Sequence, residues 1–242
     1  MEIMDSVDIM AFGAHPDDIE IGCSGTLIKM VEQGKSVVLV DLTQGEMGTR
    51  GSVEIRHKEA EASRKIIGAT ARENLKIEDG NVCVTKENKK KIAEVIRKYR
   101  PKLILLPYFK DRHPDHYQAS ELIYQGAYHA GLEKLDTGQE KFRPEKIIYY
   151  TLFSDVEEPS FIVDITEQYD KKLAAVYAFE TQFKANDNFY AETKLTSRSY
   201  NRMFEYRMGY IGSLIGADFG EAFLVKGQVA VDDITAVTFS SF

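Results

Sequence analysis

The chain has 242 residues, of which 43% are hydrophobic and 29% charged, and its formal net charge is −7. This usage predicts one globular domain covering residues 1–242, and the lack of clustered Lys and Arg argues against nucleic-acid binding. No stretch approaches the roughly 20 apolar residues of a membrane span. The N-terminal residues have no basic segment of the kind that starts a signal peptide. We therefore expect a cytoplasmic protein that binds neither nucleic acid nor membrane.

Predicted strands and helices alternate along the first half of the chain. Continuous apolar runs predict buried strands, and helical spacing with Gly or Pro at the ends predicts helices. In chain order these are a strand at 7–13, a helix at 19–34, a strand at 36–42, a helix at 54–67, a short strand at 75–77, a helix at 87–99, a strand at 103–106 and a helix at 114–130. The second half is less regular, with strands at 146–152 and 160–164 and helices at 165–178 and 201–215. This alternation predicts an α/β fold, Rossmann-like, with a mostly parallel sheet covered by helices on both faces.

Polar clusters follow three of the predicted strands. HPDDIE at 15–20 follows the first, GEMGTRG at 45–51 follows the second, and DRHPDH at 111–116 follows the strand at 103–106. Ligands of open α/β sheets bind outside the carboxyl ends of the strands. We therefore expect these clusters to meet at one edge of the sheet and form a site there.

His15, Asp18 and His116 are the candidate metal ligands. His15 and Asp18 are three residues apart at a strand-to-helix turn, which places both side chains on one face. His116 follows another strand, and two imidazoles with one carboxylate are a usual catalytic zinc set. With only Cys23 and Cys83 in the chain, a thiolate metal site is disfavoured. Zn is the expected cofactor, and Fe(II) can occupy a similar site.

The competing interpretation is that these polar residues only cap helices. Asp at a helix start often offsets the helix dipole, and taken alone Asp17 is better explained as a cap. Two His-Pro-Asp clusters at separate strand ends are hard to explain as capping twice. We therefore expect Asp17 to act as a general base within reach of a bound water.

HPDDIE at 15–20 together with HPDH at 113–116 resembles the PIG-L (LmbE-like) family of zinc N-deacetylases. GEMGTRG, Asp111-Arg112, FIVD at 161–164 and GEAF at 220–223 resemble the branch that deacetylates N-acetylglucosaminyl-malate in bacillithiol biosynthesis. The resemblance implies a metal-dependent amidohydrolase that removes an acetyl group from a linear amide of a GlcNAc conjugate. It also implies a homo-oligomer, with a hexamer as the suggested size.

The resemblance also implies roles for single residues. His15, Asp18 and His116 match the zinc ligands, and Asp17 matches the general base. His113 matches a histidine that, if protonated, stabilises the oxyanion, and Asp115 is expected to orient it. Arg50 matches an arginine that meets the carboxylate of the substrate's aglycone. Glu46 and Arg112 complete the expected substrate-binding residues of these loops, with a loop amide as the alternative partner of Glu46.

The chain departs from some relatives at Asp111, where they carry a tyrosine proposed to assist catalysis. Tyr210 is a candidate replacement from the second half, although it is more simply explained as an interface or core aromatic. We expect Arg56, His57 and Arg64 to form the solvated face of their helix, with binding of an anionic substrate as the alternative for Arg56 near the helix start. Two alternative functions stay open at this point. One is deacetylation of chitooligosaccharides or another amino sugar, and the other is a non-catalytic sugar-binding protein on the same fold.

Overall fold

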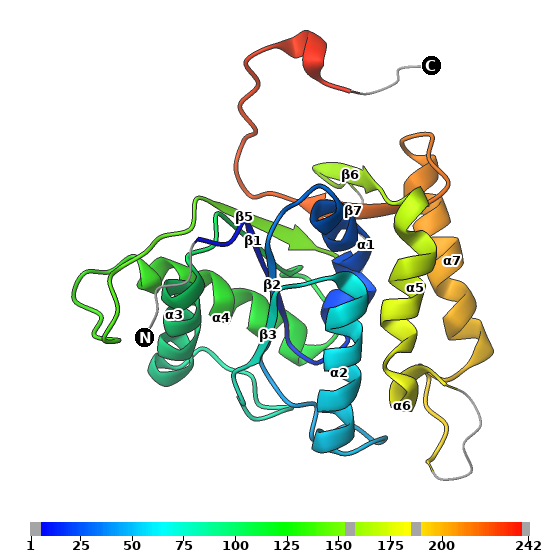
Figure 1. The fold of residues 1–242 in the computed structure, drawn as a ribbon, viewed down its shortest axis with the longest axis horizontal. Helices are drawn as coiled ribbons and strands as arrows, with labels where there is room; N and C mark the ends of the chain where they lie inside the picture. The colour runs from blue at the N-terminus through cyan, green and yellow to red at the C-terminus, as the bar shows by residue number, and fades with distance from the viewer. Residues whose placement is uncertain (1–5, 153–157, 185–189, 239–242) are drawn as a thin grey trace.

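The computed structural model describes residues 6–152, 158–184 and 190–238. Its centre is a seven-stranded sheet in the order β3-β2-β1-β4-β5-β7-β6 (Figure 1). The strands are β1 Ile9–Gly13, β2 Val37–Asp41, β3 Ala71–Asn74, β4 Leu103–Pro107, β5 Lys146–Tyr150, β6 Phe161–Asp164 and β7 Gly220–Leu224. Neighbouring strands from β3 to β5 run parallel, whereas β7 is antiparallel to both β5 and β6. The predicted α/β class with a mostly parallel sheet is confirmed.

Helices cover both faces of this sheet. They are α1 Asp18–Glu32, α2 Val53–Ile67, α3 Lys86–Tyr99, α4 Pro114–Ala130, α5 Tyr169–Tyr177, α6 Glu180–Phe183 and α7 Arg198–Ser213, with short 3₁₀ turns at Thr166–Gln168 and Ile234–Ala236. Figure 1 shows α3 and α4 on one side of the sheet and α1, α2 and α5 on the other. None of the described helices is long and apolar enough to cross a membrane.

Strand alternation explains the two hydrophobic cores. Met10 and Phe12 of β1 pack toward α3 and α4, whereas Ile9 and Ala11 pack toward α1, α2 and α5. Successive side chains of a strand point to opposite faces, so each buried strand supplies both cores. This is why the strands of the first half are apolar without a break and could be recognised from the sequence.

The short strand expected at 75–77 is wrong, because β3 lies at Ala71–Asn74. This edge strand is polar (AREN), and Arg72 of it binds buried Glu20 and Asp41, with N–O distances of 2.6 and 2.7 Å. An edge strand that buries ion pairs in place of apolar side chains has no hydrophobic signature. Strand β7 was not predicted as a strand either, although its GEAF motif was noted.

Strand β1 lies between β2 and β4 in the sheet. The chain continues from β1 toward β2 on one side and from β4 toward β5 on the other, so the strand order reverses between β1 and β4. At such a switch point, the loops after the two strands diverge and open a crevice. The loop after β1 carries His15 and the loop after β4 carries His113 and His116. The topology therefore assigns the two His-Pro-Asp motifs to the same crevice.

Candidate active site

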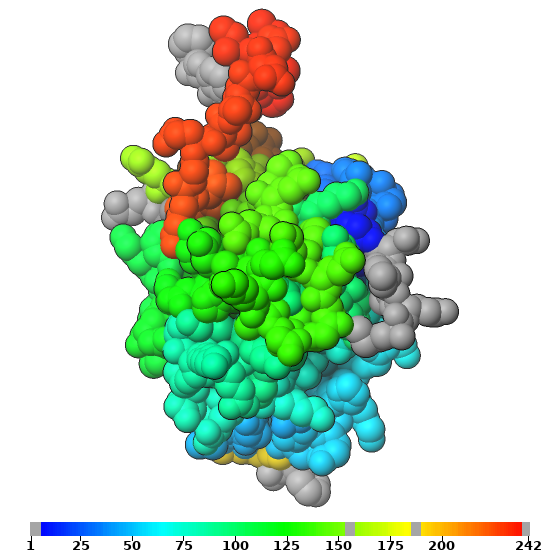
Figure 2. All heavy atoms as spheres, turned by 90° about the vertical axis from the view of Figure 1, so that its left-hand side faces the viewer, coloured from blue at the N-terminus to red at the C-terminus, as the bar shows by residue number. Residues whose placement is uncertain are grey.

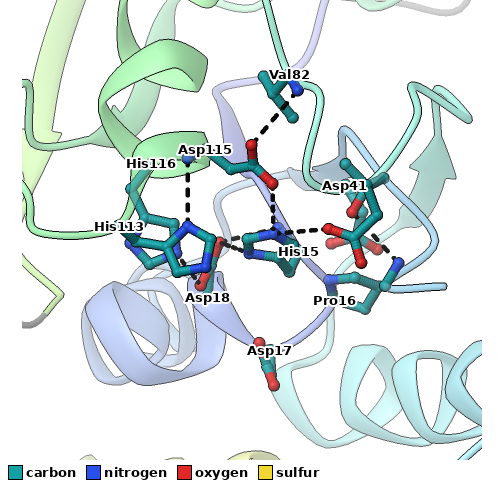
Figure 3. Close-up of polar contacts among 12 residues, drawn as sticks. His15, Pro16, Asp17, Asp18, Asp41, Val82, His113, Asp115 and His116 are labelled. Carbon is teal, nitrogen blue, oxygen red and sulfur yellow. Dashed lines mark hydrogen bonds and ion pairs between the residues drawn. The ribbon is translucent and has the colours of Figure 1, made fainter. Parts of the chain in front are cut away.

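Three histidine rings meet where β1 and β4 end (Figure 3). His15 lies in the turn between β1 and α1, and His113 and His116 lie at the start of α4. The ring centroids are 5.0 Å apart for His15 and His113, 5.4 Å for His15 and His116, and 4.6 Å for His113 and His116. Residues that are about a hundred positions apart in the sequence therefore form one cluster.

His15, Asp18 and His116 place one ligand atom each within 4.8 Å of one another. Asp18 lies between the two rings, with Oδ2 3.4 Å from His15 Nδ1 and Oδ1 3.2 Å from His116 Nε2. Both Asp18 and His116 are buried, and the His15 ring is partly exposed. This set and its partial opening fit a catalytic metal site with a position left for substrate or water.

In His15 and His116, the imidazole nitrogen that does not face Asp18 lies close to carboxylate oxygens. His15 Nε2 is 3.1 Å from both Asp79 Oδ1 and Asp115 Oδ2, and His116 Nδ1 is 3.1 Å from Asp111 Oδ1. Because an ionised carboxylate only accepts hydrogen bonds, these nitrogens are the donors. His15 Nδ1 and His116 Nε2, which both face Asp18, are then the nitrogens free to bind a cation. Carboxylates that orient metal-binding histidines in this way are usual at metal sites.

The charges of the cluster also suit a cation. Burial lowers the pKa of His15 and of His116, but the carboxylates around them outweigh it, raising the pKa of His15 well above its usual value and that of His116 to about 9. Burial opposes ionisation of Asp18, yet His116 and His15 hold its pKa well below the usual range. The concentration of negative charge that stabilises two protonated imidazoles would equally stabilise a divalent cation.

Asp17 is placed differently from its neighbours. Its side chain points away from the imidazoles in Figure 3, and its backbone has φ 125°. A non-glycine residue with this backbone is held by its surroundings at a cost of about 1–3 kcal/mol. Asp17 is buried and lines the cavity, and Arg56 Nη2 lies 3.3 Å from its Oδ2. Burial raises the pKa of Asp17 to about 7, although Arg56 opposes this.

His113 is the N-cap of α4, and its Nδ1 accepts a hydrogen bond from the backbone N–H of Asp115 at 3.2 Å. The Asp115 carboxylate contacts His15 and accepts from Gly80 N at 2.9 Å. The prediction that this carboxylate orients His113 is therefore wrong; the backbone does so. Burial, with His116 and His15, lowers the pKa of His113 and so favours the neutral ring. In that form, the hydrogen bond accepted by Nδ1 leaves the proton on Nε2.

A cavity of about 390 Å³ opens in front of this cluster. One wall carries the histidine and aspartate cluster, with Arg112 from the loop before α4. The glycine loop after β2 supplies Gly45, Met47 and Gly48, and the second half of the chain supplies Gln182, Lys194 and Leu195. Lys194 and Leu195 were not predicted, because no polar cluster at a strand end marks them.

Arg50 does not line this cavity among the described residues. It is buried, and its guanidinium donates to the carbonyl oxygens of Thr181 at 2.5 Å, Ala191 at 3.1 Å and Lys184 at 3.1 Å. In this structure Arg50 therefore holds the second-half segment that supplies Gln182 to the cavity. Its contact with a substrate carboxylate stays a prediction.

Glu46 and Tyr210 also lie outside the residues found to line the cavity. Glu46 accepts from Asp79 N at 2.9 Å and from Gln44 N at 3.1 Å, so it binds loop amides. Tyr210 is 67% exposed on α7. Tyr200 of the same helix is buried, and burial followed by the charge of Asp17 raises its pKa. Neither Glu46 nor Tyr210 has the predicted contact with a substrate cavity.

Sequence reasoning missed the roles of three site residues. Asp79 and Asp111 contact the ligand imidazoles, and Arg56 contacts Asp17. Arg56 was expected on the solvated face of α2, yet it is 4% exposed and also donates to the Pro16 carbonyl. Asp111 directly precedes the second motif, which is the signal that could have identified it, whereas Asp79 lies in a loop without such a signal.

Comparison with known proteins adds independent evidence. Residues 10–127 match the model of the PIG-L family, described as GlcNAc-PI de-N-acetylase. Diacetylchitobiose deacetylase of Thermococcus kodakarensis is 33% identical over 193 residues, which are 72% of this chain and 70% of that protein. The crystal structure of the conserved protein TT1542 from Thermus thermophilus is similar, with a TM-score of 0.84, 34% identity and coverage of 93% and 97% of the two chains. N,N'-diacetylchitobiose deacetylase from Pyrococcus horikoshii has a TM-score of 0.79 and 26% identity, covering 92% of this chain and 86% of that one.

Proposed function

The chain belongs to the PIG-L family and is an enzyme that acts on amide bonds, and on that premise we propose that it is a zinc-dependent deacetylase of a GlcNAc conjugate. The products are acetate and the free amino sugar. The proposed substrate is N-acetylglucosaminyl-malate. The observation that carries the proposal is the convergence of His15, Asp18 and His116 at one point beside Asp17, on one wall of a cavity.

His15, Asp18 and His116 would hold the metal. The second imidazole nitrogen of His15 contacts Asp79 and Asp115, and that of His116 contacts Asp111. Asp18 Oδ2 accepts a hydrogen bond from the backbone N–H of His15. These contacts fix the ligand atoms before a cation binds. A divalent cation in such a site polarises an amide carbonyl and makes water more acidic. Zn²⁺ is the proposed ion because a set of two imidazoles and one carboxylate suits it.

Asp17 is the proposed general base. It takes a proton from the attacking water as the water oxygen bonds to the acetyl carbon, and the proton is then available to the departing nitrogen. A pKa near neutrality suits both transfers, and burial provides it. Arg56 favours the ionised carboxylate and holds its orientation through Oδ2. A nearby cation would act in the same direction as Arg56.

His113 is the proposed oxyanion partner. Because its Nδ1 is occupied by the Asp115 amide, the neutral ring offers Nε2–H as a donor. Loss of one such donor typically costs about 3 kcal/mol in the transition state. This role requires no positive charge on His113, in contrast to the expectation from the sequence.

A substrate carboxylate fits the basic side chains of the cavity. Arg112 and Lys194 both line it and are exposed, and an arginine binds a carboxylate with two parallel hydrogen bonds. These residues carry the proposed recognition of malate, because they line the cavity. The second candidate substrate is a chitooligosaccharide, which is favoured by the two diacetylchitobiose deacetylases among the similar proteins.

Acetate release from N-acetylglucosaminyl-malate and from diacetylchitobiose tests the choice between these substrates. For the malate proposal, Arg112→Ala should lower kcat/KM on the malate glycoside by about 10- to 100-fold, since hydrogen bonds to charged groups contribute about 1.5–3 kcal/mol. It should change turnover of diacetylchitobiose little. The control is Arg143→Ala, because Arg143 lies against Tyr128 at the other end of α4. Equal losses on both substrates would contradict recognition of the carboxylate, and no acetate from either would overturn the deacetylase proposal.

A further inference from the structure

Residues 226–238, here called the arm, leave the body of the protein after β7. All of them are exposed. Figure 1 shows the arm rising away from the sheet and helices, and Figure 2 shows the same separation from a perpendicular direction. Lys226 at its start still lies over the rings of Phe109 and Tyr124, 4.4 and 4.9 Å from their centroids. The hydrogen bonds found for the described part of the arm beyond that point join Asp233 to Thr235 and Ala236 within the arm itself.

The arm is apolar for an exposed segment. Val229, Val231, Ile234 and Val237 are 66%, 48%, 81% and 44% exposed. Single exposed apolar residues need no explanation, but a run of them on a segment that stands away from the core is unfavourable in water. Such a run indicates that another surface covers the arm when the protein is in solution.

A second exposed apolar surface lies on α7 and the two residues that follow it. Met208 and Ile211 of this helix are buried against Ile165 and Ala222, whereas Tyr206, Tyr210, Leu214 and Ile215 are exposed by 47% to 67%. Tyr206, Tyr210 and Leu214 are four residues apart, so they form one row along the helix. We call these four residues the α7 stripe.

The arm and the α7 stripe are complementary in length and charge. The row from Tyr206 to Leu214 is about 12 Å long at 1.5 Å per residue, and four extended residues reach about 13 Å. Arg202 continues the row, is exposed, and lies over the Tyr206 ring at 5.5 Å. The arm carries Asp232 and Asp233 between its apolar side chains, so acidic and apolar groups of the arm match basic and apolar groups of α7.

We propose that the arm docks on the α7 stripe of a second copy of this chain, so that two chains exchange arms. A symmetric exchange buries two arms and two stripes with the same contacts, which is the usual arrangement in a homodimer. In this dimer, Tyr210 of the α7 stripe is an aromatic side chain of the interface. The proposal does not depend on the chemistry of the active site.

Sedimentation velocity of the full chain at about 1 to 100 µM tests the exchange. The wild type should associate. Ile234→Asp on the arm and Leu214→Asp on the stripe should each weaken association by about tenfold or more, because each places a charge where an apolar side chain is buried. The matched controls Gln228→Asp and Ser213→Asp add the same charge at neighbouring exposed polar positions and should associate more like the wild type.

Mixing the two defective variants identifies the partner surface. Ile234→Asp keeps an intact stripe and Leu214→Asp keeps an intact arm, so a mixed dimer has one intact contact and one contact that carries both substitutions. Because a contact already broken by one substitution loses little more from the second, the mixed dimer should form more tightly than either variant alone. Circular dichroism and thermal unfolding show whether each variant is folded. A wild type that stays monomeric at all concentrations, variants that associate like the wild type, or a mixture no stronger than its components would each overturn the proposal.

Discussion

The two walls of the cavity differ in how their side chains are fixed. On the wall formed after β1 and β4, each ligand imidazole is held by carboxylates, and His113 is held by a helix-start amide. On the opposite wall, supplied by the second half of the chain, Lys194 is exposed and Leu195 is half-buried. Arg50 holds the neighbouring backbone by donating to its carbonyl oxygens. We infer that the histidines and aspartates of the first wall carry out the reaction, whereas Arg112 beside them and Lys194 on the opposite wall bind the substrate. Substitutions in these two groups of residues should therefore affect different kinetic constants.

The largest effect on catalysis is expected from Asp17→Asn. This change preserves size but removes the proton acceptor, so kcat should fall by about 10²- to 10⁴-fold. Metal content should stay the same, because Asp17 points away from His15 and His116. Acetate release and elemental analysis measure the two quantities. Loss of metal together with activity would show that Asp17 belongs to the metal-binding cluster and not to a separate base.

Asp111→Asn tests whether the first wall is rigid because carboxylates orient its histidines. It weakens the hydrogen bond to His116 Nδ1, and zinc affinity should fall by about 10- to 100-fold. Competition with a chelator measures the dissociation constant. Asp170→Asn serves as the control, because Asp170 is exposed on α5. An unchanged dissociation constant in Asp111→Asn would remove Asp111 from the account.

Metal binding should weaken as the pH falls. In the metal-free protein, burial lowers the pKa of His116, but Asp18 and Asp111 outweigh this effect and raise it to about 9. Below that pH, a cation has to displace a proton from His116 and also from His15, whose pKa is raised as well, so affinity should fall by at least about tenfold for each pH unit between 9 and 7. Zinc titrations at several pH values measure this slope. An affinity that does not change with pH would contradict the assignment of His116 as a ligand.

The smallest effect is expected on the opposite wall. Lys194→Ala should raise KM for a carboxylate-bearing substrate by about fivefold or less, with kcat nearly unchanged, because exposed charge pairs contribute at most about 1 kcal/mol. Steady-state kinetics measure both constants, with Lys134→Ala as a distant exposed control. A large fall in kcat would mean that the two groups of residues are not separate in function.

The first wall could be predicted because its chemistry lies at the ends of apolar parallel strands. HPDDIE and HPDH follow β1 and β4, whose runs of buried residues identify them, and the topology then brings both motifs together. The family is also confirmed by the comparisons. The assignment of residues 1–242 to a single domain stays a prediction, although strands from both halves share one sheet.

The rest of the site depends on contacts between segments that no local pattern encodes. Arg50 and Arg56 are six residues apart, yet Arg50 turns to carbonyls near residue 181 and Arg56 turns to Asp17. Choosing between them required the position of the second half of the chain. Asp79 likewise reaches His15 only because the loop after β3 folds back over the cluster.

The most direct test of the account is to strip the protein of metal with a chelator and measure acetate release before and after adding back zinc, in the wild type and in Asp18→Ala. The account predicts that activity disappears on stripping and returns when about one equivalent of zinc binds per chain, whereas Asp18→Ala neither retains the metal nor recovers. Full activity in the stripped wild type, or equally tight zinc binding by Asp18→Ala, would contradict a metal site formed by His15, Asp18 and His116.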